Sequence, residues 1–209
     1  MKTATDGSTG PRPAKPVGIV LAGGASSRMG RDKALLMARG EPLDESLPAA
    51  AARRLAAVCA EVAVADRGRG LLPGVPSLAD GPGRGPAAGI LGAAAAYPGR
   101  SLLVLACDLP EVPVDLLAEL VRWEDYDAAV PRWAGGFEPL CALYGPAALA
   151  VLAARVERGR FALHELAAEA GLTVRVVGED ELARFGRPEE IFLNLNTPED
   201  WRRYERSTG

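Results

Sequence analysis

Short apolar segments alternate along this chain with longer stretches rich in alanine and leucine, and no other feature constrains the fold as much. The pattern predicts strands near residues 17–22, 61–65, 101–107, 127–131 and 172–177. It predicts helices at 46–60, 86–97, 113–123, 146–156, 161–170 and 198–206. Because strands that alternate with helices build βαβ units, we expect an α/β protein whose mostly parallel central sheet carries helices on both faces.

The run SLLVLAC at residues 101–107 is almost continuously apolar, as in a central strand buried on both faces. It ends at Asp108, which would then lie at the carboxyl edge of the sheet, where parallel sheets bind their ligands. A carboxylate there is a natural ligand for Mg²⁺, which takes one or two carboxylates together with phosphate oxygens and water. The alternative is that Asp108 caps a helix, since Pro110 and Pro113 follow it.

The composition excludes several classes of protein. A length of 209 residues favours one domain, which we place at residues 17–209. Residues 1–16 are rich in Pro, Gly, Ser and Thr and lack the apolar core of a signal peptide, so we expect a disordered leader. The formal charge of -3 argues against nucleic-acid and anionic-membrane partners, and no apolar run approaches the roughly 18 to 20 residues of a membrane span. Three cysteines without a CxxC pair indicate a reduced, cytoplasmic protein.

A glycine-containing turn follows the first predicted strand, in the run LAGGASSRMGRDK at residues 21–33. Gly23 and Gly24 would let backbone N–H groups approach phosphate oxygens closely, because glycine has no Cβ and tolerates positive φ. Arg28 and Lys33 add positive charge, and Lys33 is the only lysine outside the N-terminal tail in a chain that otherwise uses arginine. The run matches neither GxxxxGK[ST] nor GxGxxG, and a simple tight turn is the alternative. The charges favour a site for a polyanion.

A second glycine- and proline-rich stretch, Gly68–Gly85, is more typical of an active-site loop than of a domain linker. Arg67, Arg69, Asp80 and Arg84 lie in or beside it, which supports that interpretation. Asp80 precedes a predicted helix. It is a candidate to accept hydrogen bonds from a nucleotide base or ribose, or else to shape a turn.

The C-terminal run LNLNTPEDW places Asn194 and Asn196 two residues apart, so both amides would project from the same face of a strand. Thr197 and Pro198 fit the N-cap and first residue of a helix, with Asp200 in the capping-box position. Capping does not explain the paired asparagines. A polar ligand with several donors and acceptors would explain them.

Hydrolytic chemistry has little support in this sequence. The single histidine, His164, lies in a helical pattern and is expected to pack or face solvent. No serine or cysteine stands in a nucleophile context, so a catalytic triad is not expected. Any catalysis must then depend on how the protein positions its substrates and on the charges that it places around them.

Taken together, these motifs resemble the molybdenum cofactor guanylyltransferase (MobA-like) family. The matching segments are LAGGASSRMGRDKALL, DGPGRGPAAGI, CDLP, EPLCALY at 138–144 and LNLNTPEDW, in the order of the family. The resemblance implies a Rossmann-like three-layer αβα nucleotidyltransferase fold. It also implies transfer of GMP from GTP to the phosphate of molybdopterin, which gives molybdopterin guanine dinucleotide and pyrophosphate, with Mg²⁺, or alternatively Mn²⁺, as cofactor. Transient contact with proteins that deliver molybdopterin or accept the product is compatible with it.

The same resemblance assigns roles to individual residues. Asp108 would contact the nucleotide and Mg²⁺, and Lys33 the phosphates, with Arg28 as a further catalytic charge. Asn194 and Asn196 would bind molybdopterin. The nucleotide-binding residues would be Leu21, Ala22, Gly23, Gly24, Lys33, Asp80 and Asp108.

Three departures keep alternatives open. Ala65 followed by Asp66 stands where the family often carries a guanine-contacting asparagine, PAAGI replaces PLAGI, and Glu138 stands where a glutamine or another neutral residue is expected. The glycine pair of LAGG favours the guanylyl branch over the cytidylyltransferases, which typically have LAAG. The alternatives are a molybdopterin cytidylyltransferase, a phospholactate guanylyltransferase, and a nucleotide-binding regulatory module without catalysis. A sugar-phosphate nucleotidyltransferase would ordinarily be longer.

Overall fold

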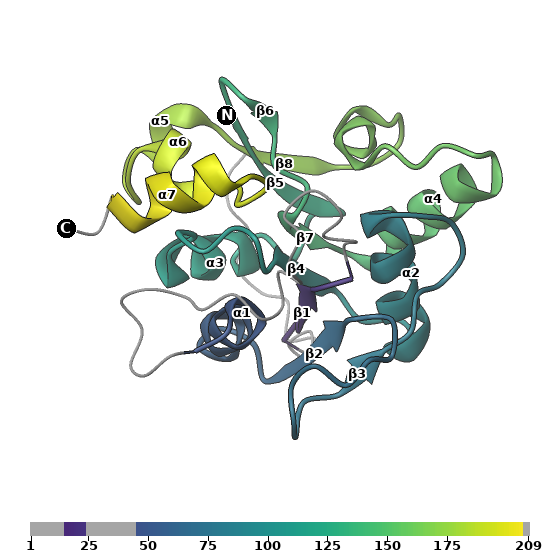
Figure 1. Cartoon of the computed structure of the whole chain (residues 1–209). Helices are drawn as coiled ribbons and strands as arrows, with labels where there is room; N and C mark the ends of the chain where they lie inside the picture. The colour runs from purple at the N-terminus through teal and green to yellow at the C-terminus, as the bar shows by residue number, and fades with distance from the viewer. Residues whose placement is uncertain (1–14, 24–44, 207–209) are drawn as a thin grey trace, which may run out of the picture.

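The computed structural model describes residues 15–23 and 45–206. Their centre is an eight-stranded sheet with the order β3-β2-β1-β4-β7-β5-β6, in which β8 also pairs with β5 (Figure 1). The strands are β1 (Val17–Leu21), β2 (Glu61–Ala65), β3 (Ser77–Leu78), β4 (Leu102–Ala106), β5 (Ala128–Trp133), β6 (Gly136–Phe137), β7 (Cys141–Tyr144) and β8 (Val174–Val177).

The core of the sheet is parallel. Strand β1 pairs in parallel with β2 and β4, and β2 pairs in parallel with β3. Strand β7 enters between β4 and β5 and runs antiparallel to both, which the strand pattern did not predict. Its four residues, CALY, are all buried. A buried run of this length is ambiguous in sequence, because four apolar residues fit a strand and a turn of helix equally well.

Helices cover both faces of the sheet, so the molecule has three layers (Figure 1). Side chains of successive strand residues point to opposite faces, and both faces are buried. On β1 and β4, Val20 and Leu105 belong to the core beneath α1 and α3, whereas Ile19 and Val104 belong to the core beneath α2 and α4. This double burial explains the continuous apolar sequences of these strands. The helices are α1 (Leu47–Ala56), α2 (Pro86–Ala96), α3 (Val114–Val121), α4 (Pro146–Glu157), the 3₁₀ helix η2 (Leu163–Ala168), α5 (Glu179–Leu182), α6 (Pro188–Ile191) and α7 (Pro198–Arg206).

Some predicted elements differ from the observed ones. The helix expected at 161–170 is the shorter 3₁₀ helix η2, and β3, β6, α5 and α6 were not predicted. Pro113 is the N-cap of α3 and not a residue of its first turn, because its ψ of 151° is extended. The leader expected at residues 1–16 lies almost entirely outside the described residues, so it stays a prediction. No helix in the described part of the chain is long and apolar enough to cross a membrane.

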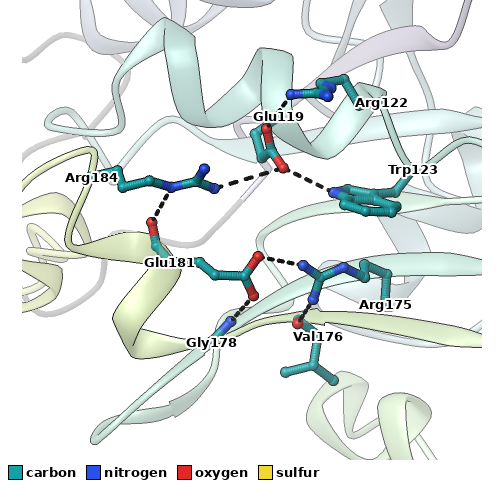
Figure 2. A network of polar contacts seen from close by, with 8 residues as sticks. All are labelled: Glu119, Arg122, Trp123, Arg175, Val176, Gly178, Glu181 and Arg184. Atoms are coloured by element: carbon teal, nitrogen blue, oxygen red, sulfur yellow. Dashed lines mark hydrogen bonds and ion pairs between the residues drawn. The ribbon is translucent and has the colours of Figure 1, made fainter.

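A network of charged and aromatic side chains joins α3 to the C-terminal elements (Figure 2). Glu119 of α3 accepts a hydrogen bond from the indole Nε1 of Trp123 at 3.2 Å and pairs with Arg184 at 3.9 Å. The guanidinium of Arg175, on β8, lies 4.5 Å from the centre of the Trp123 ring and also pairs with Glu181 of α5. These contacts fix β8 and α5 against α3, and so support the chain that leads to the predicted asparagine segment.

Candidate nucleotide site

A pocket of about 120 Å³ opens at the carboxyl ends of β1, β2 and β4. It brings together four of the residues that were predicted to bind the nucleotide: Leu21, Gly23, Asp80 and Asp108. The other lining residues are Ala65, Arg67, Gly85, Pro86, Gly89, Ala106 and Leu140. The pocket therefore lies where a parallel sheet is expected to bind its ligand.

Small residues at the strand ends make room for the pocket. Leu21, Ala65 and Ala106 are neighbours across the three strands, and the two alanines contribute only a methyl group each. Helix α2 begins directly above them. A Cβ on its Gly89 would stand 3.3 Å from Leu21 Cδ2 and 3.4 Å from Ala65 Cβ, so glycine allows the helix to approach this floor closely.

The loop that carries Asp80 is held by its backbone. Gly81 donates a backbone hydrogen bond to the carbonyl of Ala88 at 2.8 Å, and a Cβ on Gly92 would meet the carbonyl oxygen of Ala79 at 2.1 Å. The chain on both sides of Asp80 thus packs directly against α2. The Asp80 carboxylate pairs with Arg67, with Oδ2 and Nε 3.2 Å apart.

The same loop is supported from the outside by the segment before η2. The guanidinium of Arg84 lies 4.6 Å from the centre of the Phe161 ring. Behind Phe161, Arg155 is only 1% exposed and forms hydrogen-bonded ion pairs with Glu165, at 2.5 Å, and with Glu169. This buried arginine fixes the support on which the loop rests.

Asp66 has a structural role. It is fully buried, and its carboxylate accepts hydrogen bonds from the backbone N–H groups of Leu71, at 2.8 Å, and Arg69, at 3.2 Å, and from the Ser77 hydroxyl. Burial by itself would raise the pKa of Asp66, but these hydrogen bonds outweigh it and lower the pKa below its usual value. Arg69 also donates to the carbonyl of Ala22 at 2.7 Å, which ties this loop to the start of the predicted phosphate loop.

Asp108 is not the cap of the following helix, because the N-cap of α3 is Pro113. That alternative is therefore wrong. The backbone carbonyl of Asp108 accepts a hydrogen bond from the N–H of Leu195 at 3.0 Å, which brings the asparagine segment to the edge of the site. The side chain of Asp108 lines the pocket.

Mg²⁺ fits the donors at this edge. No group of three or more His, Cys, Asp or Glu side chains gathers around a common point within residues 15–23 and 45–206. Of the two aspartates in the open pocket, Asp80 pairs with Arg67. The carboxylate of Asp108 suits Mg²⁺, which commonly completes its coordination with substrate phosphates and water. Asp108 would hold the ion on the protein side.

Glu138 is electrostatically coupled to this carboxylate. The pKa of Glu138 is raised to about 7, chiefly by burial and further by the negative charge of Asp108, while a hydrogen bond from the Leu140 backbone offsets part of the rise. At neutral pH a large fraction of Glu138 is therefore protonated. This resembles the neutral side chain that the family was expected to carry at this position.

The paired asparagines do not lie on a strand. Residues 193–196 have no regular secondary structure, and the N–H of Asn196 donates to the carbonyl of Asn194 at 3.0 Å. The expectation of two amides on one strand face is thus wrong. Asn194 is partly buried, and its Oδ1 has no hydrogen-bond partner in the described part of the chain, whereas Asn196 is exposed. The capping box is confirmed, since Asp200 and Thr197 exchange hydrogen bonds at 2.8 and 3.1 Å.

Gly24, Arg28 and Lys33 lie outside the described residues, so their roles stay predictions. Ala22 is buried beside the pocket and does not line it. Arg67 lines the pocket although its sequence context indicated only a residue of the glycine-rich loop. The sequence feature that could have indicated this role is the position of Arg67 directly after β2, at the start of the glycine-containing run DRGRG.

The comparisons with known proteins agree with this architecture. A family model described as the MobA-like NTP transferase domain matches residues 18–172. A protein of Nostoc sp. strain PCC 7120 named "Probable molybdenum cofactor guanylyltransferase" is 34% identical over 193 residues, which cover 87% of this chain and 86% of that protein.

Solved structures confirm the predicted fold. Molybdopterin-guanine dinucleotide biosynthesis protein A from Archaeoglobus fulgidus superimposes with a TM-score of 0.75 at 24% identity, over 92% of this chain and 98% of that one. A Mycobacterium tuberculosis protein crystallised in complex with manganese superimposes with a TM-score of 0.61 at 22% identity, over 92% of this chain and 98% of that one. The three-layer arrangement is that of nucleotidyltransferases.

Proposed function

Since the chain belongs to the MobA-like NTP transferase family, we propose that it transfers GMP from GTP to the phosphate of molybdopterin, forming molybdopterin guanine dinucleotide and pyrophosphate. The observation that carries this proposal is the pocket in which Leu21, Gly23, Asp80 and Asp108 converge. The names of relatives such as the Nostoc protein support the choice of GTP and molybdopterin as substrates.

The reaction needs alignment and charge neutralisation more than proton transfer. An oxygen of the molybdopterin phosphate forms a bond to the α-phosphorus of GTP, and the bond from that phosphorus to the bridging oxygen of the β-phosphate breaks. The electron pair leaves with pyrophosphate. Because the attacking oxygen is already anionic at neutral pH, no general base is required, and preorganised positive charge supplies most of the rate enhancement.

The residues of this chain divide that work. Asp108 would hold Mg²⁺, which when bound neutralises charge on the phosphates. Lys33 and Arg28 would add positive charge, and the backbone around Gly23 and Gly24 would donate hydrogen bonds to phosphate oxygens. The pocket beside Asp80 would receive the guanosine.

The acceptor would enter from the C-terminal side. The N–H of Leu195 donates a hydrogen bond to the backbone carbonyl of Asp108, so Asn194 lies next to the edge at which the metal would bind. The buried amide oxygen of Asn194, which lacks a partner among the described residues, is a ready acceptor for a pterin N–H group.

The test is incubation of the purified protein with Mg²⁺, each of the four NTPs separately, and either molybdopterin or phospholactate as acceptor. The readouts are pyrophosphate release, the nucleotide-containing product and the affinity for each NTP. We expect turnover of GTP with molybdopterin and no turnover of ATP, CTP or UTP. Turnover with CTP would identify a cytidylyltransferase, and turnover of GTP only with phospholactate would identify a different acceptor. Tight GTP binding without turnover on either acceptor would indicate a regulatory module.

A further inference from the structure

Arg67 has an unusual backbone conformation for its residue type. Its φ of +65° lies in the left-handed region, and among the described residues every other position in that region is a glycine. Gly68 and Gly70 follow with similar φ values of 72° and 66°. Glycine would adopt the same conformation at position 67 without strain, and strained side chains concentrate at functional sites. The arginine side chain is therefore expected to be needed.

Stability does not explain this need. The Arg67 side chain is 49% exposed and that of its partner Asp80 is 31% exposed, and ion pairs at such exposure contribute little to folding. Loop closure does not explain it either, because Arg69 already performs that task. Arg69 donates to the backbone carbonyls of Asp66, at 2.9 Å, and Ala22, at 2.7 Å.

The position of Arg67 points to a ligand. Its side chain lies next to Gly23, at the start of the predicted phosphate loop, since a Cβ on Gly23 would stand 3.6 Å from both its Cγ and its Nε. Its Nε pairs with Asp80 Oδ2 at 3.2 Å, and both residues line the pocket. A guanidinium carries five N–H donors, so a contact through Nε leaves donors for a bound molecule.

We propose that Arg67 is a specificity-determining residue that, together with Asp80, recognises the guanine base of the nucleotide. Guanine presents an acceptor, O6, next to two donors, N1–H and the N2 amino group. Arg67 beside Asp80 presents a donor next to an acceptor, which is the complementary arrangement. Adenine reverses both positions, with an amino group toward the arginine and a bare N1 toward the carboxylate.

The surrounding surface suits a flat base. Ala65, Pro86 and Gly89 line this part of the pocket with small apolar groups, against which a base can pack. Phosphate groups would be repelled here by the neighbouring carboxylate of Asp80. Arg67 would also take the place of the guanine-contacting asparagine that this chain lacks. Asp66 is not available for that role, because its carboxylate accepts hydrogen bonds from the backbone of its own loop. This inference rests on the proposed use of GTP.

The test uses two substitutions at one position. Arg67→Gly removes the guanidinium and relieves the backbone strain, whereas Arg67→Ala removes the guanidinium and keeps the strain. An effect shared by both variants comes from the side chain. Arg158→Ala, at an exposed position on the C-terminal side of α4, is the matched control. Affinities for GTP, ITP and ATP are measured by calorimetry with Mg²⁺ and no acceptor, together with thermal melts, and the wild type is also titrated with CTP and UTP.

Both Arg67 variants are expected to lose the preference for GTP over ATP by about tenfold or more, the scale of one good arginine–guanine contact. ITP, which shares O6 and N1–H with GTP, should lose affinity to the same extent as GTP, and ATP should change little. Arg67→Gly should melt no lower than the wild type, and Arg158→Ala should bind all three nucleotides normally.

Three results would overturn the assignment. If the wild type prefers GTP and both variants keep that preference, Arg67 does not recognise the base, although the proposed function stands. If all three nucleotides weaken equally, Arg67 serves the triphosphate instead. A wild type that binds CTP or UTP in preference to GTP would overturn both proposals, and this is visible before any variant is made.

Discussion

Replacing Gly92 by alanine tests whether the backbone packing behind Asp80 sets the geometry of the pocket. A Cβ on Gly92 would stand 2.1 Å from the carbonyl oxygen of Ala79 and 2.9 Å from the backbone nitrogen of Gly81. Carbon and carbonyl oxygen atoms in close contact are normally about 3.3 Å apart. The chain on both sides of Asp80 must therefore retreat from α2 by about 1 Å.

This displacement should affect catalysis more than stability. Forcing an extra methyl group into a packed contact costs about 1–3 kcal/mol, while alanine in a helix interior regains about 0.5–1 kcal/mol relative to glycine. The net loss of about 0–2.5 kcal/mol leaves the protein folded at 25 °C. A misplacement of about 1 Å in a binding group can lower the rate about a hundredfold, and we expect that loss in kcat/KM for GTP.

The measurements are steady-state kinetics with varied GTP and a thermal melt. Gly178→Ala is the matched control, because Gly178 has a φ of -79° and a Cβ there would meet nothing within 4 Å. It should change neither quantity appreciably. Wild-type kcat/KM and an unchanged melting temperature in Gly92→Ala would refute the reasoning, since the contact would then have relaxed without moving Asp80.

Three further changes test other parts of the structure. Asp108→Asn should abolish most metal-dependent turnover, with partial recovery at high Mn²⁺ and a nearly unchanged melting temperature; unchanged turnover at low Mg²⁺ would exclude Asp108 as a ligand. Arg155→Met should lower stability by about 1–2 kcal/mol, because it removes the hydrogen bonds that Arg155 donates to Glu165 and Glu169 while Arg160 still pairs with both carboxylates, and calorimetry should show a loss of roughly 2 to 8 °C. Glu138→Gln tests the raised pKa. The native protein holds the Glu138 proton more tightly than the unfolded chain does, so its contribution to stability is full below about pH 4.5 and is lost as the pH rises through about 7. The melting temperature of Glu138→Gln relative to the wild type should therefore rise between pH 5 and pH 8, and a constant difference would contradict the assignment.

The parallel core of the fold could be predicted from the sequence because each of its strands is a distinct apolar run. The predicted segments 17–22, 61–65 and 101–107 differ from β1, β2 and β4 by at most one residue at either end. The elements that were missed depend on their neighbours. Strands β3 and β6 have two residues each, and such short pairings form only because an adjacent strand offers its edge.

The C-terminal segment shows which local patterns carry enough information. The capping box of Thr197 and Asp200 was predictable, because its hydrogen bonds join residues three apart and need no tertiary structure. The strand assumed for Asn194 and Asn196 was not, since two polar residues with a spacing of two are too few to establish a period. A backbone hydrogen bond from Leu195 to Asp108, which is distant in sequence, holds that segment in place.

The residues after β2, Asp66 and Arg67, bear on whether the chain is an enzyme or a regulatory module. Ala65 followed by Asp66, in place of a guanine-contacting asparagine, was the sequence support for a regulatory module without catalysis. In the structure Asp66 points into its own loop and closes it, and the next residue, Arg67, extends into the pocket and pairs with Asp80. The loss of one polar contact to the base is therefore accompanied by another polar group at the same wall of the pocket. The strained conformation of Arg67 is consistent with nucleotide binding, which both alternatives share. Because Asp108 lines that pocket as well, the missing asparagine by itself does not favour a regulatory module over an enzyme.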